Sequence, residues 1–149
     1  MPGARALWLC GKHLIAPDPE GTLSAVGAAG VVCLNERHEL VDRYPGYCEW
    51  LGSDRRALWS PVPDLGVTSP ESMTDLVVET RRRLDDGDIV VHCGAGMGRA
   101  GTVAVGVLIA AGLDAASALA VIAAARPGAG PESGAQADLV ARWSGQPPK

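Results

Sequence analysis

The sequence predicts an α/β fold in which a central, mostly parallel sheet is flanked by helices. Two observations support this. Short apolar runs alternate along the chain with longer segments that have the apolar spacing and capping residues of helices. Alternation of this kind is typical of layered α/β proteins with parallel strands. We expect the 149 residues to form a single domain, 1–149, because no linker or internal repeat divides them.

The first part of the chain is expected to hold three strands and two short helices. The strands are short apolar runs at residues 6–9, 31–34 and 57–59. The helices lie between them, at residues 23–29, with Gly30 as the end signal, and at residues 45–51. A loop rich in proline and glycine then occupies residues 60–69.

The helix after this loop has the clearest start signals in the chain. Ser69 can cap it, Pro70 suits its first position, and Glu71 complements the positive end of the helix dipole. Gly87 is expected to end the helix, before a buried strand at 89–91. Three more helices complete the predicted fold, at residues 99–111, 114–125 and 131–143.

Composition and charge argue against several classes of partner. The net charge of -4 gives no electrostatic reason to expect nucleic acid or an anionic membrane, and no apolar segment resembles a membrane span. The basic run Arg81, Arg82 and Arg83 is interpreted as a solvated helix face. The four cysteines form no CxxC pair, so we expect no disulfide framework, no metal site and a reducing, cytoplasmic location. No cofactor is predicted.

The chemistry is expected in the segment from His92 to Arg99, called here the cradle loop. It lies between a predicted strand and a predicted helix, and its glycines let the backbone curl so that N–H groups can surround a tetrahedral oxyanion. Cys93 would lie at the bottom as a thiolate nucleophile, and Arg99 would bind two anion oxygens. The predicted phosphate-binding residues are Gly94, Ala95, Gly96, Met97, Gly98 and Arg99.

The cradle loop resembles the HCxxGxxR signature of the protein tyrosine phosphatase superfamily. It is most similar to small atypical dual-specificity phosphatases, whose loops often read HCxxGxGRTGT, where this chain reads HCGAGMGRAGT. The segments Val62-Pro63-Asp64 and Arg126-Pro127-Gly128 resemble the general-acid loop of that family and a segment after a later helix. The resemblance implies a cysteine-phosphatase-like fold and hydrolysis of phosphomonoesters through a phosphocysteine intermediate.

Four residues other than Cys93 and Arg99 are given candidate roles. Asp64 is the candidate general acid, although an aspartate after proline can also bond its own turn. Glu36 resembles the acidic residue that orients the loop arginine, with a surface glutamate as the alternative. His92 is expected to be buried against the loop. Gln136 could correspond to a water-positioning glutamine, but its spacing differs.

Position 100 departs from the family pattern. Most relatives have serine or threonine after the loop arginine, and its hydroxyl assists breakdown of the intermediate; this chain has Ala100. A catalytically weak phosphate-binding module is therefore an alternative, and a rhodanese-type sulfurtransferase is a second one. Since neither Gly94 nor Met97 is basic, inositol phosphates are less favoured than a phosphorylated protein or a small phosphoester.

Overall fold

The computed structural model of the chain describes residues 5–149, and its centre is a four-stranded sheet. All paired strands run parallel, in the order β1-β4-β2-β3. The strands are β1 (Leu7–Gly11), β2 (Ala28–Cys33), β3 (Ala57–Trp59) and β4 (Asp88–Cys93). The predicted α/β class is confirmed, and the sheet is parallel throughout.

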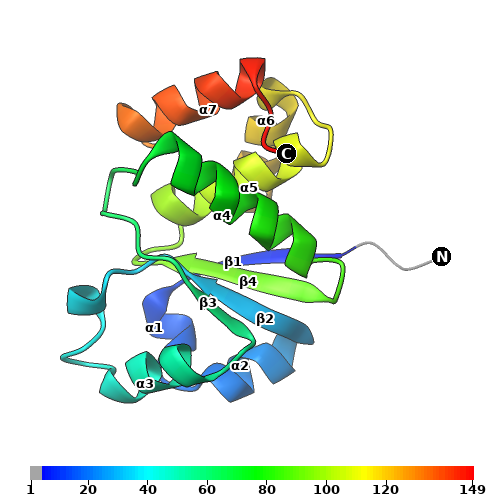
Figure 1. Cartoon of the computed structure of the whole chain (residues 1–149). Helices are drawn as coiled ribbons and strands as arrows, with labels where there is room; N and C mark the ends of the chain where they lie inside the picture. The colour runs from blue at the N-terminus through cyan, green and yellow to red at the C-terminus, as the bar shows by residue number, and fades with distance from the viewer. Residues whose placement is uncertain (1–4) are drawn as a thin grey trace.

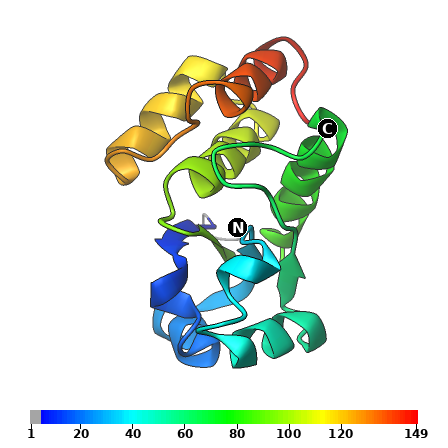
Figure 2. The ribbon, with the colours of Figure 1, turned by 90° about the vertical axis from the view of Figure 1, so that its left-hand side faces the viewer.

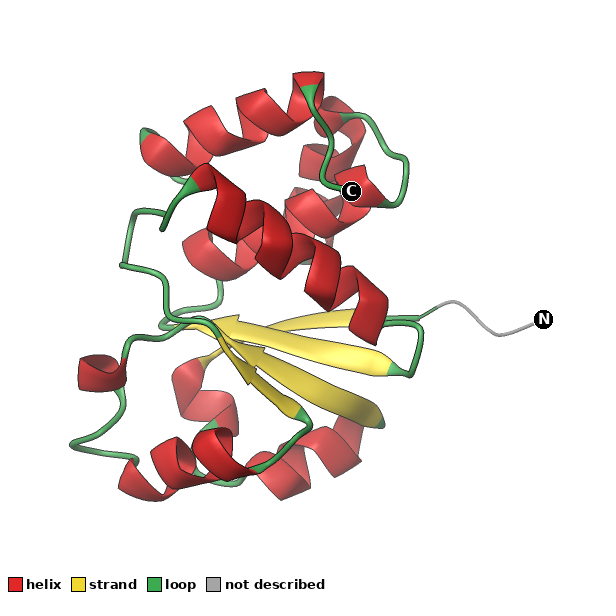
Figure 3. Ribbon diagram, in the orientation of Figure 1, coloured by secondary structure: helices red, strands yellow, loops and turns green. Residues whose placement is uncertain are grey.

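Helices cover both faces of the sheet (Figures 1 and 3). On one face lie α1 (Lys12–Ile15), α2 (Pro19–Val26) and α3 (Pro45–Ser53). On the other lie α4 (Pro70–Arg83), α5 (Gly98–Ala110), α6 (Ala115–Ala125) and α7 (Ala135–Gly145). Figure 2, turned by 90°, shows the same three layers from the side. A short 3-10 helix, η1 (Arg37–Glu39), follows β2.

Each face of the sheet has its own apolar core. The core beneath α4 to α7 includes Val91, Val103 and Trp143, which are almost fully buried. The core on the α1 to α3 side includes Tyr47 and Leu51. Helix α5 is central to the larger core, since nearly all of its residues are buried and it contacts α4, α6 and α7. The start of α5 is therefore held rigidly over the sheet.

The first long helix differs from the prediction. It spans Pro19–Val26 because Asp18 caps its start by accepting a hydrogen bond from the Gly21 N–H (3.0 Å), and Gly27 ends it with a left-handed φ of 69°. Gly30 therefore lies inside β2 and does not end a helix. Helices α1 and η1 were not predicted, because elements of three or four residues are too short to show a periodic pattern.

The sheet order places the end of β4 between β1 and β2. Gly11 pairs with Cys93, and Cys33 pairs with His92, so the carboxyl ends of three strands meet where the cradle loop begins. In open α/β sheets this edge is where ligands bind. Among residues 5–149, no helix is both long enough and apolar enough to cross a membrane.

Candidate active site

The cradle loop connects β4 to α5, as predicted. Cys93 is the last residue of β4, and Arg99 is the second residue of α5. Both are buried, with 2% and 3% of their surfaces exposed. The strand and the helix are each packed into the core, so the two reactive side chains are held on rigid elements at either end of the loop.

The carbonyl oxygens of residues 94–98 in the cradle loop are bonded from outside the loop. The acceptors and their donors are Gly94 O from the Lys12 N–H (3.1 Å), Ala95 O and Gly96 O from the Arg126 guanidinium (3.0 and 2.9 Å), Met97 O from the Gly130 N–H (3.2 Å) and Gly98 O from the Thr102 hydroxyl (2.7 Å). By contrast, no N–H of residues 94–97 donates a hydrogen bond within the described part of the chain. These N–H groups are free to bind an anion.

The tight path of the loop depends on Gly96. Its φ is 75°, in the left-handed region that glycine adopts without steric cost. A Cβ at this position would lie 2.4 Å from the backbone carbon and oxygen of Cys10 at the end of β1. Only glycine allows the loop to turn this closely against the neighbouring strand.

Arg99 is held in place by a buried carboxylate. Its Nη1 and Nη2 each donate to one oxygen of Glu39 at 2.7 Å, and Nη1 also donates to Val62 O at 2.9 Å. Burial alone would raise the pKa of Glu39, but the hydrogen bonds from Arg99 and from the Glu36 N–H outweigh it and hold that pKa at about 2. Within residues 5–149, the buried Nε of Arg99 has no hydrogen-bond partner. A bound oxyanion would provide that partner.

The acidic partner of Arg99 is thus Glu39, and the prediction of Glu36 in this role is wrong. The η1 turn directs Glu39 towards the sheet, where its carboxylate also accepts bonds from the Glu36 N–H (2.7 Å) and Asn35 Nδ2 (3.0 Å). The Glu36 side chain instead lies 3.4 Å from His38 Nε2 near the surface. Glu36, His38 and Glu39 are close enough to share a cation, but the Glu39 oxygens already accept four hydrogen bonds. This cluster therefore does not fit a metal site.

Asp64 lies in the same cavity as Cys93 and Arg99. The cavity has a volume of about 460 Å³, and Lys12, Leu65 and Glu132 contribute to its wall. Asp64 Oδ1 is 3.5 Å from Arg99 Nη2, and the side chain is 73% exposed. The same oxygen accepts the Leu65 N–H at 3.0 Å, so the aspartate also bonds its own turn. The two interpretations of Asp64 are compatible, since the turn bond orients a carboxylate that remains accessible to a ligand.

His92 is fully buried beneath the loop, as predicted. Its Nε2 lies 2.6 Å from the hydroxyl oxygen of Tyr47, a residue of α3 that sequence patterns did not single out. Burial lowers the pKa of His92 to about 4, although its contact with the Cys93 backbone acts in the opposite direction. The imidazole is consequently neutral at physiological pH and supports the end of β4 through hydrogen bonding.

Neither position 100 nor position 102, close to Arg99 in the chain, provides a hydroxyl donor to Cys93. Ala100 is fully buried in the larger core. Thr102, which could have compensated for it, directs its hydroxyl to Gly98 O (2.7 Å) and lies 3.2 Å from Gln136 Oε1. Arg126 was singled out only by the family resemblance. Its guanidinium supports the cradle loop from outside by donating hydrogen bonds to two loop carbonyl oxygens.

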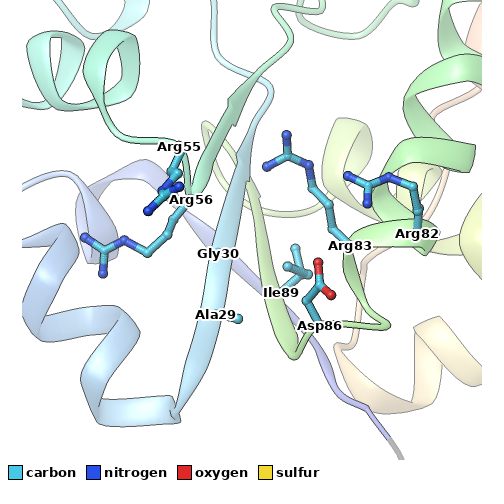
Figure 4. Close-up of a pocket in the computed structure, with 8 residues that line it drawn as sticks. All are labelled: Ala29, Gly30, Arg55, Arg56, Arg82, Arg83, Asp86 and Ile89. Atoms are coloured by element: carbon cyan, nitrogen blue, oxygen red, sulfur yellow. The ribbon is translucent and has the colours of Figure 1, made fainter.

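A second hollow, of about 280 Å³, lies at the opposite edge of the sheet (Figure 4). Arginines enter it from two sides, Arg55 and Arg56 next to β3 and Arg82 and Arg83 at the end of α4. Most of their charge is already neutralised: Arg56 pairs with Asp54 and Glu20, and Arg82 and Arg83 share Glu79. Three of the four arginines that line this hollow are therefore already engaged by carboxylates.

Comparisons with known proteins agree with this geometry. Residues 15–137 match the family described as "Swiss Army Knife protein, DSP-PTPase phosphatase domain". No protein of curated function matches the chain in sequence.

Solved phosphatase structures have the same fold. The active form of Tk-PTP has a TM-score of 0.72 and 24% identity, with 97% of this chain and 94% of that chain covered. Its G95A mutant form has a TM-score of 0.69 and 29% identity, covering 87% and 85%. Human DUSP28 has a TM-score of 0.72 and 19% identity, covering 95% and 93%. PTPMT1, solved in complex with PI(5)P, has a TM-score of 0.69 and 20% identity, covering 95% and 88%.

Proposed function

Because this chain belongs to the DSP-PTPase phosphatase domain family of Swiss Army Knife proteins, we propose that it is a cysteine-dependent phosphomonoester hydrolase. One observation carries the proposal. Within residues 5–149, the N–H groups of residues 94–97 and Arg99 Nε have no hydrogen-bond partner, and they belong to the loop that starts where Cys93 ends β4. A buried donor such as Arg99 Nε is costly to leave without a partner, and a phosphoryl group on the nucleophile would satisfy it together with the loop N–H groups.

The first step is displacement at phosphorus. The Cys93 thiolate forms a bond to phosphorus while the bond to the ester oxygen breaks, and that oxygen leaves with the electron pair. Arg99 and the loop N–H groups stabilise the negative charge on the three remaining oxygens. Asp64 transfers its proton to the leaving oxygen, a contribution of about 10²–10⁴-fold in reactions of this type.

The second step is hydrolysis of phosphocysteine. Asp64, now ionised, accepts a proton from a water molecule, whose oxygen attacks phosphorus and releases orthophosphate and the Cys93 thiolate. Throughout both steps Glu39 keeps the Arg99 guanidinium facing the cradle through its paired hydrogen bonds.

The cavity favours a phosphorylated protein or a small phosphoester as substrate. Phosphotyrosine, together with phosphoserine or phosphothreonine, fits a cavity of about 460 Å³ whose wall includes the exposed Leu65. A highly charged inositol headgroup is less favoured, since Glu39, Asp64 and Glu132 place negative charge in the cavity and the loop has no lysine. PTPMT1 was nevertheless solved with PI(5)P, so phosphoinositides belong in the substrate screen.

A catalytically weak phosphate-binding module is the second candidate function. The observation that favours it is Ala100, because the engaged Thr102 hydroxyl does not replace the missing one. On this basis Ala100→Thr is expected to speed breakdown of phosphocysteine, provided that the buried site accommodates the larger side chain. The rhodanese alternative is not supported by the family match.

Phosphate release from 4-nitrophenyl phosphate tests the proposal. We expect turnover by the wild-type protein and none by Cys93→Ser. Asp64→Ala should strongly reduce turnover of unsubstituted phenyl phosphate, whose leaving oxygen needs the proton. Binding of phosphate without turnover would favour the weak phosphate-binding module instead. Turnover that persists in Cys93→Ser would refute the nucleophile assignment. A parallel screen of phosphopeptides, phosphoinositides and nucleotides, with Cys93→Ser as blank, identifies the substrate class.

A further inference from the structure

Gln136 is a fully buried polar residue next to the candidate active site. Two backbone groups fix the orientation of its amide, because each can play only one role. The Glu132 N–H must donate, and it lies 2.9 Å from Gln136 Oε1. The carbonyl oxygen of Gly66 must accept, and it lies 3.1 Å from Gln136 Nε2. The amide is therefore held on one side by the segment that precedes α7 and on the other by the loop that carries Asp64.

The bond to Gly66 completes the attachment of a short segment, the acid turn (residues 62–66). At the start of this turn, Val62 O accepts a hydrogen bond from Arg99 Nη1 at 2.9 Å. At its end, Gly66 O accepts from Gln136, and the Gly66 N–H donates to Pro63 O at 3.1 Å. Asp64 lies between these two attachments. Its position relative to Arg99 is thus determined at both ends of the turn.

The backbone at the centre of the acid turn is strained. Leu65 has a φ of 63°, in the left-handed region that is unfavourable for a non-glycine residue. Its side chain is 64% exposed, so packing of that side chain does not compensate the cost. Such a conformation persists only where surrounding contacts enforce it. The hydrogen bonds to Val62 O and Gly66 O enforce it from outside the turn, in addition to the bonds that Asp64 Oδ1 and Pro63 O accept within it.

Gln136 also lies next to the cradle loop. Its Oε1 is 3.2 Å from the Thr102 hydroxyl, which donates to Gly98 O at 2.7 Å. One buried amide therefore lies between the turn that carries the acid and the loop that carries the nucleophile. Each end of the amide already bonds a backbone group, and this arrangement favours a role in holding the acid turn over the water-positioning role.

We propose that Gln136 is a positioning residue that holds the acid turn so that Asp64 can protonate the leaving oxygen. This rests on the proposed phosphatase function. If Gln136 acts through the acid, its loss slows the formation of phosphocysteine only from substrates whose leaving oxygen needs the proton. A substrate with an acidic phenol as leaving group needs little protonation, whereas one with a basic phenol, of pKa about 10 as in tyrosine, depends on it.

The experiment compares Gln136→Leu with wild type on 4-nitrophenyl phosphate and on unsubstituted phenyl phosphate. We expect kcat/KM, which reports the step that forms phosphocysteine, to fall by about 10²-fold for phenyl phosphate, the lower limit for loss of a general acid, and by less than about threefold for 4-nitrophenyl phosphate. Inhibition by inorganic phosphate should not change, since the cradle loop remains intact. In an Asp64→Asn background the same substitution should have no further effect on phenyl phosphate.

Two additional variants make the outcome decisive. Gln146→Leu is the matched control, because Gln146 follows α7 and is exposed, and it should match wild type on both substrates. Gln136→Glu keeps the side-chain volume but places an acceptor against Gly66 O, so it should behave like Gln136→Leu. An equal fall on both substrates, no fall, or loss of folding in both Gln136 variants would overturn the positioning role. Absence of turnover in the wild type would instead refute the proposed function.

Discussion

Replacing Glu39 by glutamine perturbs the ion pair that orients Arg99 while preserving side-chain volume. The Glu39 carboxylate accepts four hydrogen bonds, two on each oxygen. The amide of the new glutamine has one NH₂ group, which must replace one of the two carboxylate oxygens. In either orientation this NH₂ group faces two hydrogen-bond donors, so two of the four hydrogen bonds are lost. The Arg99 charge, on a side chain that is 2% exposed, then has only the exposed Asp64 carboxylate, 3.5 Å away, to compensate it.

The magnitude follows from two independent estimates. Removing one partner of a buried ion pair costs about 3–5 kcal/mol of unfolding free energy. Separately, the pKa of Glu39 is lowered from 4.5 to about 2, which corresponds to about 3 kcal/mol of stabilisation of the ionised form in the folded state. We therefore expect Glu39→Gln to lower the unfolding free energy by about 3 kcal/mol at neutral pH.

Urea denaturation across pH measures this loss. A pKa that is lower in the folded state means that the contribution is present above the unfolded pKa, near 4.5, and disappears as the pH falls towards about 2. The difference between wild type and Glu39→Gln should therefore be largest at neutral pH and shrink below about pH 4.5. Glu36→Gln is the control and should cost less than about 1 kcal/mol, because Glu36 is a surface residue beside His38. A loss below about 1 kcal/mol for Glu39→Gln, or a difference independent of pH, would refute the reasoning.

Three further predictions concern the support of the cradle loop. Because the pKa of His92 is lowered to about 4 in the folded state, stability should fall by about 2 kcal/mol between about pH 7 and pH 5, and His92→Asn should remove this dependence in urea titrations. Gly96→Ala should lower kcat/KM by about 10²-fold, since its Cβ would collide with the Cys10 backbone and displace the loop; near-normal kinetics would contradict the described loop path. In Arg126→Lys the ammonium group cannot bond Ala95 O and Gly96 O together, so inhibition by inorganic phosphate should weaken by about tenfold. Unchanged inhibition would show that the loop holds its shape without that support.

Much of the fold could be predicted from local patterns. The start of α4 was correct because Ser69, Pro70 and Glu71 signal it through local backbone chemistry. The predicted boundary between α2 and β2 was wrong. Gly27 and Gly30 are both possible helix-ending residues in the sequence, and only the left-handed conformation of Gly27 distinguishes them. Short elements such as α1 offered no periodicity to detect.

The residues of the candidate site also fall into those that local patterns predict and those that only tertiary contacts place. The sequence by itself determined the cradle loop, because Cys93 and Arg99 lie on one contiguous segment whose glycines and flanking elements are visible as a pattern. Only the tertiary structure decided which side chains support them. Glu39 and Gln136 come from distant segments, and their partners were settled by the direction of the η1 turn and the docking of α7. Contacts between segments far apart in the chain depend on packing, which leaves no local spacing to recognise.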